Sequence, residues 1–435
     1  MGSTGGHDAG ADSGHCREFP GFALPDAPVW RVAAGAHMTD TCGRTVLDLA
    51  MGFGTALYGH GVVPRTVMAQ YELGNRDAGD TGDRLADSDS STGTIPAGGL
   101  GDLMRNASRV RATRLLTSWA ASRWGSHGVP AYELRALVLH TGSEAVETAL
   151  KTALLATGRS RIVAFTNAYH GTFGLALATT HRAEFRAPFA AQYATDAVRF
   201  EPFGVVPELT TADACVIVEP VQGRAGIIVP PAGFLHELRE ACTQVGALLI
   251  LDDVLVGCGR TGAALEGAHV APDMICLGKA LGGGLAASAV LATRAVAERA
   301  WGSSNPAATV AGGEIVHTST LVGDALASAA VCATLEHYDQ AAIDEHGAAW
   351  LTALREAADH ARWTLRGRGL MWALDSGRAG EGFATFRALL DVHNIVTIPS
   401  GSDGSSLTFL PSLACTDADR ARTVRALVEL LGLMA

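Results

Sequence analysis

The chain has 435 residues, of which 48% are hydrophobic and 18% are charged, and its formal net charge at pH 7 is −11. This length and composition are typical of a globular protein with a large buried core, and they exclude a disordered or fibrous chain. The negative charge argues against a nucleic acid as the main partner. No apolar run is long enough for a membrane span, and the N-terminus lacks the basic and apolar regions of a signal peptide.

The eight cysteines are scattered along the chain without a close pair. This spacing argues against a zinc site and against a disulfide framework, and it favours a reducing cytoplasm. The histidines show no metal-binding spacing either, so we expect no metal.

Composition divides the N-terminal part of the chain. Residues 1–18 are rich in Gly, Ser, Asp and His and are predicted to be disordered. Residues 75–100 are rich in Gly, Asp and Ser, which predicts a long loop. We expect residues 19–70 to form the first part of a small domain, residues 71–320 a large domain, and residues 321–435 the rest of the small domain.

From about residue 131 onward, predicted strands and helices alternate. The predicted strands of this region are 135–140, 161–165, 214–218, 247–251 and 274–277. The predicted helices are 143–157, with Ser143 as its N-cap and Gly158 as its stop, and 234–245, stopped by Gly246. Such alternation predicts an α/β fold with a mostly parallel, doubly wound sheet. Chemistry in such sheets gathers beyond the carboxyl ends of the strands.

The C-terminal third has a different pattern, which predicts a smaller α+β domain. Its predicted elements are helix 350–362, strands 369–374 and 406–410, and a final helix 417–433 capped by Thr416.

Only two of the 33 basic residues are lysines, Lys151 and Lys279. Lys279 lies in the glycine-rich segment 277–284. Arginine cannot become a neutral amine near pH 7, so a lysine kept in such a setting suggests covalent amine chemistry. The alternative is a leftover surface lysine, which the apolar and glycine neighbours disfavour.

Other residues at strand ends would suit a cofactor with an aldehyde, a pyridine ring and a phosphate. The segment 141–144 offers the amides of a helix N-terminus to a phosphate, although a plain N-cap looks the same. Asp252 ends an apolar run, where an unpaired carboxylate would be costly, and it suits a pyridine nitrogen. Val254 and Tyr169 could cover the two ring faces, although Tyr169 could equally be a core or rim tyrosine.

Five segments carry a specific resemblance. They occur in order within about 140 residues, as 142–147, 169–171, 219–223, 252–254 with 259–262, and 278–280. Together they resemble the class III aminotransferases, which are pyridoxal-phosphate enzymes of fold type I. The resemblance implies a large cofactor-binding domain with a mostly parallel sheet. It also implies a smaller α+β domain that the N- and C-terminal segments form together.

The resemblance also implies residue roles. Lys279 would form the Schiff base with pyridoxal 5'-phosphate and then move the substrate proton, while Asp252 would pair with the pyridine nitrogen. Further cofactor contacts are implied for Gly142, Ser143, Tyr169, His170, Val254 and Thr320. Thr320 matches the threonine that reaches the phosphate of the neighbouring subunit, which implies a homodimer with its active site at the interface. Lys151 matches nothing catalytic, and with Glu147 it is predicted to form a surface helix pair.

One departure from the family bears on the substrate. Most members carry an arginine on the C-terminal strand that binds a substrate carboxylate, and Thr408 stands in its place. Glu219, the usual partner of that arginine, would then be an unpaired acceptor in the substrate pocket and favour a cationic substrate. We therefore expect an amine or amino-sugar-like substrate without a carboxylate at the reacting carbon. Alternatively, one of Arg224, Arg366 and Arg368 binds a carboxylate instead.

The expected function is transfer of an amino group between that amine and a carbonyl acceptor by a ping-pong Schiff-base mechanism. The main alternative is an epimerase or isomerase that uses the same lysine to move a proton. An eliminating lyase is a weaker alternative, and the presence of both Lys279 and Asp252 disfavours a non-catalytic protein.

Overall fold

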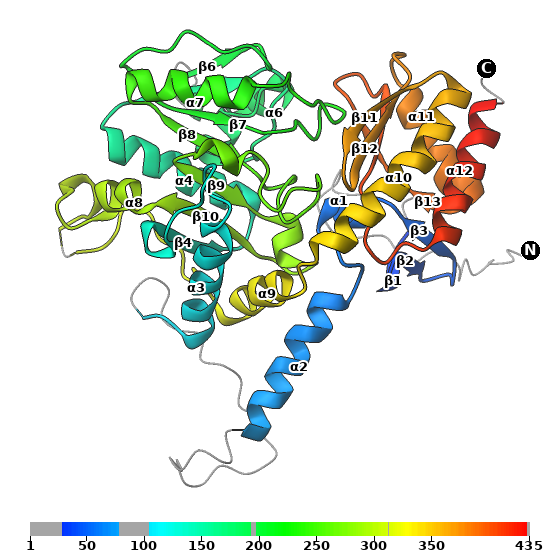
Figure 1. The fold of residues 1–435 in the computed structure, drawn as a ribbon, viewed down its shortest axis with the longest axis horizontal. Coiled ribbons are helices and arrows are strands. Elements are labelled where there is room, and N and C mark those ends of the chain that lie inside the picture. Colours follow the sequence, from blue (N-terminus) through cyan, green and yellow to red (C-terminus); the bar gives the residue numbers. More distant parts are fainter. Residues whose placement is uncertain (1–27, 78–103, 193–196, 312, 433–435) are drawn as a thin grey trace, which may run out of the picture.

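The computed structural model describes residues 28–77, 104–192, 197–311 and 313–432, which form two lobes (Figure 1). The prediction of disorder for residues 1–18 lies outside these residues, as does most of the predicted loop 75–100. Residues 75–77 are the last turn of a helix, α2 (Val62–Asp77).

The larger lobe is built on a sheet of seven strands. Their order is β4 (Leu134–Leu139), β10 (Ser288–Thr293), β9 (Met274–Leu277), β8 (Leu248–Asp252), β7 (Asp213–Val218), β5 (Arg161–Phe165) and β6 (Val198–Glu201). All strands run in one direction except β10, which is antiparallel to both of its neighbours. The prediction of a mostly parallel sheet is confirmed. β6 and β10 were not predicted.

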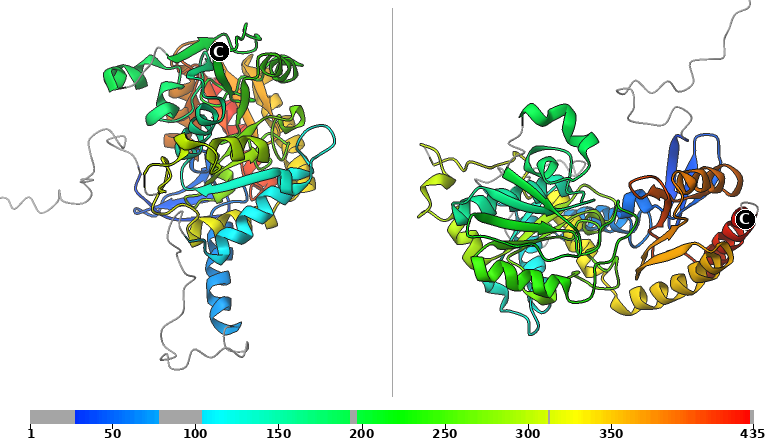
Figure 2. Two further views of the ribbon diagram at one scale, coloured as in Figure 1. Left: turned by 90° about the vertical axis from the view of Figure 1, so that its left-hand side faces the viewer. Right: turned by 90° about the horizontal axis from the view of Figure 1, so that it is seen from above.

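Helices cover both faces of this sheet (Figure 2). Alternate residues of each strand point to opposite faces, and they join two separate apolar clusters. One cluster includes α4 (Gly142–Thr157) and α8 (Arg294–Trp301). The other includes α3 (Ala107–Ala121), α7 (Phe234–Val245) and α9 (Ala325–Glu336). This is the doubly wound arrangement that the sequence predicts.

The start of α4 differs from the prediction in a way that affects the site. Thr141, not Ser143, is the N-cap, and its Oγ1 accepts the amide of Glu144 at 3.2 Å. The Glu144 carboxylate accepts the amide of His140 at 3.0 Å. Because Thr141 and Glu144 satisfy these amides, the Ser143 hydroxyl is not needed to cap the helix.

The smaller lobe joins the two ends of the chain, which Figure 1 shows as blue strands beside orange and red elements. One sheet has the order β1 (Trp30–Ala34), β2 (His37–Asp40), β3 (Thr45–Asp48), β13 (Ile395–Val396). The other has the order β11 (Thr364–Arg368), β12 (Met371–Asp375), β15 (Ser406–Phe409), β14 (Ile398–Ser400). The parallel pairing of β3 with β13 ties the N-terminal segment to the C-terminal one.

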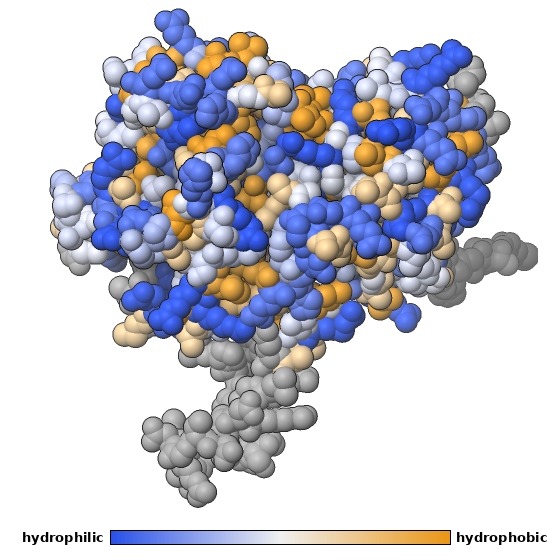
Figure 3. Space-filling view, viewed as in Figure 1, coloured by the Kyte–Doolittle hydropathy of each residue, from blue (hydrophilic) through white to orange (hydrophobic). Residues whose placement is uncertain are grey.

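The remaining helices complete the two lobes. They are α1 (Met51–Gly54), α5 (Gly174–Ala178), α6 (Ala183–Arg186), α10 (Gln340–Ala361), α11 (Glu381–His393) and α12 (Asp417–Gly432). α10 begins at Gln340 rather than at residue 350, and it packs against α12. The domain boundaries at residues 70/71 and 320/321 stay predictions. Polar and apolar side chains are intermixed on the face in Figure 3, and no described helix is both long and apolar enough to cross a membrane.

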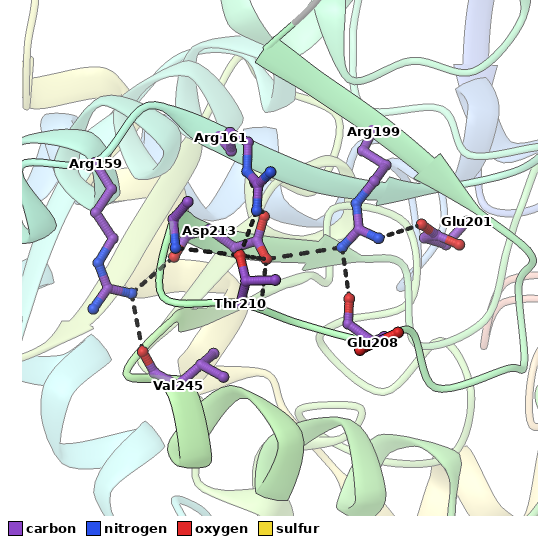
Figure 4. Close-up of polar contacts among 9 residues, drawn as sticks. Arg159, Arg161, Arg199, Glu201, Glu208, Thr210, Asp213 and Val245 are labelled. Carbon is purple, nitrogen blue, oxygen red and sulfur yellow. Dashed lines mark hydrogen bonds and ion pairs between the residues drawn. The ribbon is translucent and has the colours of Figure 1, made fainter.

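An ionic network around one buried aspartate closes the edge of the large sheet opposite the predicted site (Figure 4). Asp213, at the amino end of β7, is fully buried and lies 3.1 Å from Arg161 Nε and 3.8 Å from Arg199 NH2. Its carboxylate also accepts the amide of Thr210, and Arg159 donates to its backbone carbonyl. Because chemistry gathers at the carboxyl ends of these strands, we assign this network a structural role.

A buried arginine connects separate segments of the chain. Arg260 has no exposed surface, and it donates to the backbone carbonyls of Gly54 (3.1 Å), Leu370 (3.3 Å) and Pro411 (2.6 Å). Burial lowers the pKa of Arg260 to about 10, so the side chain stays charged at pH 7. One cation therefore links α1, the residue before β12 and the segment after β15.

We expect Arg260→Met to lower the free energy of unfolding by about 3–5 kcal/mol, because three buried carbonyls would lose a charged donor. The midpoint of urea unfolding measures this loss. Arg355→Met, at an exposed position of α10, is the matched control and should leave the midpoint unchanged. Equal midpoints for the two variants would contradict the connecting role.

Candidate active site

The structure gathers the predicted residues at one edge of the large sheet. Each follows the carboxyl end of a strand: Gly142 and Ser143 follow β4, Tyr169 and His170 follow β5, Glu219 follows β7, Asp252 ends β8, and Lys279 follows β9. These strands all run in the same direction, and only β10 separates β4 from the others, so their carboxyl ends and the side chains beyond them lie at one edge.

Asp252 and His170 form a buried pair at the centre of this edge. The Nδ1 atom of His170 lies 2.7 Å from Oδ2 of Asp252, and both residues are less than 5% exposed. A carboxylate can only accept, so Nδ1 carries the proton. The other carboxylate oxygen accepts the amide of Val254 at 3.1 Å. Thr180 holds the peptide of His170 in place by accepting its amide at 2.9 Å, a contact that the sequence did not reveal.

Lys279 stands next to this pair with an unusual backbone. Its φ is 43°, in the left-handed region that residues with a side chain rarely adopt, and such strain is concentrated at functional sites. Burial lowers the pKa of the Lys279 amine, and the charge of Arg224 lowers it further, while Asp252 and Glu219 oppose the shift. The lower pKa raises the fraction of neutral, nucleophilic amine at a given pH.

The start of α4 forms a tight cradle beside Lys279. A Cβ at Gly142 would lie 2.6 Å from Cγ1 of Val254, and a Cβ at Gly171 would lie 2.3 Å from Oγ of Ser143. Only glycine therefore fits at these two positions. The first amides of α4 have no acceptor within the helix, and the helix dipole favours an anion there.

These features fit the functional groups of pyridoxal phosphate. The N-terminus of α4 and Ser143 suit the phosphate, the buried carboxylate of Asp252 suits a protonated ring nitrogen, and the amine of Lys279 suits the aldehyde. No group of three His, Cys, Asp or Glu side chains that could hold a metal is found among the described residues.

The expectation that Glu219 is an unpaired acceptor was wrong. Its Oε1 accepts the amide of Tyr169 at 2.9 Å and its Oε2 accepts the amide of Gly223 at 3.0 Å, so the carboxyl group is not an unpaired acceptor. Burial raises the pKa of Glu219, and the negative charge of Asp252 adds to the rise. Thr408 is also buried, and its Oγ1 lies 2.7 Å from the hydroxyl of Ser400.

The three arginines that could replace the missing one differ in their contacts. Arg366 pairs with Asp375 at 3.0 Å, and Arg368 pairs with Glu266 at 2.8 Å. Arg224 instead lies over the ring of Tyr169, with 4.6 Å between its Cζ and the ring centroid.

Two other predicted residues lie apart from this group. Thr320 is exposed on the segment before α9, and no contact joins it to Gly142 or Ser143 within the described part of one chain. Lys151 lies 3.3 Å from Glu147, as predicted. However, Glu147 is buried and also accepts the amide of Leu175 at 2.5 Å, so the two residues are not a simple surface pair.

The fold and the gathered residues define a pyridoxal-phosphate enzyme of fold type I. The family described as "Aminotransferase class-III" matches residues 104–431. The chain belongs to this family, and it is a pyridoxal-phosphate-dependent aminotransferase.

Curated relatives and solved structures agree. Acetylornithine aminotransferase of Methanopyrus kandleri is 34% identical over 378 residues, which cover 84% of each chain. Putrescine aminotransferase of Pectobacterium atrosepticum is 34% identical over 317 residues, 67% of this chain and 64% of that one. The crystal structure of N-acetylornithine aminotransferase from Stenotrophomonas maltophilia has a TM-score of 0.69 and 25% identity, covering 94% of this chain and 97% of that chain. The ornithine aminotransferase of Toxoplasma gondii has the same fold, with a TM-score of 0.76 at 22% identity and coverage of 96% and 92%.

Proposed function

We propose that the enzyme moves an amino group from an amine or amino-sugar-like substrate, without a carboxylate at the reacting carbon, to a carbonyl acceptor. The observation that carries this proposal is Thr408. A small buried hydroxyl, already bonded to Ser400, stands on β15 where related enzymes hold a carboxylate-binding arginine. The relative named putrescine aminotransferase supports the proposal, because putrescine is a diamine without a carboxylate.

We propose the following residue roles. When bound, pyridoxal phosphate supplies an aldehyde and an electron-withdrawing ring that stabilises negative charge on the reacting carbon. The amine of Lys279 would take the proton from that carbon and deliver it to the carbon that was the aldehyde of the cofactor. Asp252, held by His170, keeps the ring nitrogen protonated. Gly142 and Ser143 would bind the phosphate, and Tyr169 and Val254 would cover the two faces of the ring. Glu219 and Thr408 would contact the substrate.

We further propose that the enzyme works as a cytoplasmic homodimer. Thr320, which would reach the partner's phosphate, is exposed beside Leu321, Ile315 and Val316, which are 60%, 37% and 44% exposed. Apolar side chains of this kind favour burial against a second copy of the chain. The seven described cysteines are unpaired, which agrees with a reducing compartment.

A matched pair of donors tests the substrate proposal. Neither putrescine nor 4-aminobutyrate has a carboxylate on the carbon that carries the reacting amine, but the far end is an amine in one and a carboxylate in the other. The pair therefore separates an amine-like substrate from an amino acid. With pyruvate as the acceptor, we expect kcat/KM for putrescine, or for an aminodeoxysugar, to exceed that for 4-aminobutyrate about tenfold or more, a difference of about 1.4 kcal/mol.

Higher kcat/KM for 4-aminobutyrate or β-alanine would contradict the proposal. Omission of pyruvate is the control, because product formation without an acceptor would indicate an isomerase instead of an aminotransferase.

A further inference from the structure

Arg224 places an unpaired guanidinium group over the ring of Tyr169, a residue of the proposed cofactor site. Its Cζ lies 4.6 Å from the ring centroid of Tyr169 and 5.7 Å from that of Phe185. The side chain is exposed, and among the residues that the structure describes no carboxylate or carbonyl accepts from its guanidinium. Stacking on an aromatic face leaves the N–H edge of a guanidinium open to a planar anion.

The backbone of Arg224 is held from two sides. The amides of Gly226 and Ile227 both donate to the carbonyl of Gly223 at 3.2 Å, which forms a tight turn. The amide of Gly401, from the smaller lobe, donates to the carbonyl of Arg224 at 3.2 Å. The turn therefore fixes where the side chain starts, while the exposed guanidinium can rotate about its side-chain bonds.

The surroundings connect this guanidinium with the reacting amine. Glu219, which precedes the turn, binds the amides of both Tyr169 and Gly223, so the turn and the stacking ring form one unit. The charge of Arg224 contributes to the lowered pKa of Lys279, which places the two cations within electrostatic reach. Arg366 and Arg368 already pair with carboxylates.

We propose that Arg224 binds the carboxylate of the second substrate. This substrate is the keto acid that accepts the amino group of the amine, and its product is the corresponding amino acid. This inference rests on the proposed ping-pong transfer, in which one site must accept two substrates in turn. The acid would use the bidentate edge of Arg224, and the amine, which has no carboxylate at its reacting carbon, would leave the guanidinium stacked on Tyr169. Arg224 would thus determine specificity for the acid and take no part in proton transfer.

Binding of an unreactive acid to the holoenzyme tests this proposal directly. Propionate and propionamide have the same shape, but only propionate carries a charge. We expect Arg224→Gln to weaken propionate binding, measured by calorimetry, about ten- to hundredfold. Propionamide binding should not change. In single-turnover measurements at low concentration of each substrate, the half-reaction with pyruvate should slow by a much larger factor than the half-reaction with putrescine. Loss of the Arg224 charge also acts on the pKa of Lys279, and that effect is common to both half-reactions.

Arg123→Gln is the matched control. Arg123 is partly exposed and also lies over two aromatic rings, with its Cζ 4.9 Å from the Trp119 ring and 5.6 Å from the Tyr338 ring, outside the proposed site. Unchanged propionate binding in Arg224→Gln, or an equal loss in both half-reactions, would overturn the inference. If putrescine were no substrate while propionate binding still depended on Arg224, the proposed amine specificity would fail and the role of Arg224 would stand.

Discussion

Lys279→Ala is expected to abolish transamination, with a fall in kcat of about 10⁴-fold, because one amine provides both the covalent attachment and the proton transfer. The fold should persist, since Lys279 lies in a short turn after β9 and is not part of a strand or of the apolar clusters. Circular dichroism and the urea midpoint check this point. Borohydride treatment in the presence of pyridoxal phosphate, followed by mass spectrometry, should attach a pyridoxyl label to Lys279 in the wild-type protein and none in the variant.

The chain supplies an unusually clean control for this experiment. Lys151 is its only other lysine, and it lies on α4, where its Nζ is 3.3 Å from the Glu147 carboxylate. Lys151→Arg keeps that positive charge and leaves Lys279 as the sole lysine. This variant should keep both the label and the activity. Label retained in Lys279→Ala, or activity retained without it, would show that another group reacts with the cofactor.

The positions of the reactive groups could be predicted because each ends a short apolar strand. The run 247–251 is followed at once by Asp252, and the run 274–277 by Gly278 and Lys279. In a parallel sheet such chain positions translate directly into spatial ones, since neighbouring strands end at the same edge. The scarcity of lysine then singled out Lys279.

Other features were readable in the sequence but were missed. Thr141 and Glu144 have the spacing of a capping box, which identifies Thr141 as the N-cap. Only residues 278–287 join β9 to β10. A parallel crossover needs about a dozen residues or more, so this short connection requires the antiparallel pairing that the structure shows.

The contacts of Glu219 and Arg224 could not be predicted in this way. Both depend on the backbone path of one irregular turn, which directs the amides of Tyr169 and Gly223 at one carboxyl group. Neither periodicity nor spacing reports where amides outside regular elements point. The resemblance to the family pointed to Thr408 in place of an arginine, which stays a prediction, but it could not show that the carboxyl group of Glu219 is already bonded.

Asp252→Asn is expected to lower kcat about 10²- to 10³-fold, a loss comparable to removing a preorganised electrostatic contact in other enzymes. An amide cannot carry the negative charge that keeps a ring nitrogen protonated. It also weakens the hydrogen bond from Nδ1 of His170, because the acceptor is then neutral. Steady-state kinetics with saturating putrescine and pyruvate measure the loss. Asp252→Glu keeps the charge but moves it by one methylene, so its kcat should lie between those of the wild type and Asp252→Asn.

Asp253 makes the test of charge specific, because it is the adjacent carboxyl group and is also fully buried. Burial, together with the charge of Glu266, raises the pKa of Asp253 well above its usual range. An amide at position 253 therefore removes less negative charge than an amide at position 252. If the charge of Asp252 drives catalysis, Asp253→Asn should reduce kcat far less than Asp252→Asn, even though both substitutions disturb buried hydrogen bonds. Equal losses would mean that the carboxylate of Asp252 only maintains the structure of the sheet edge.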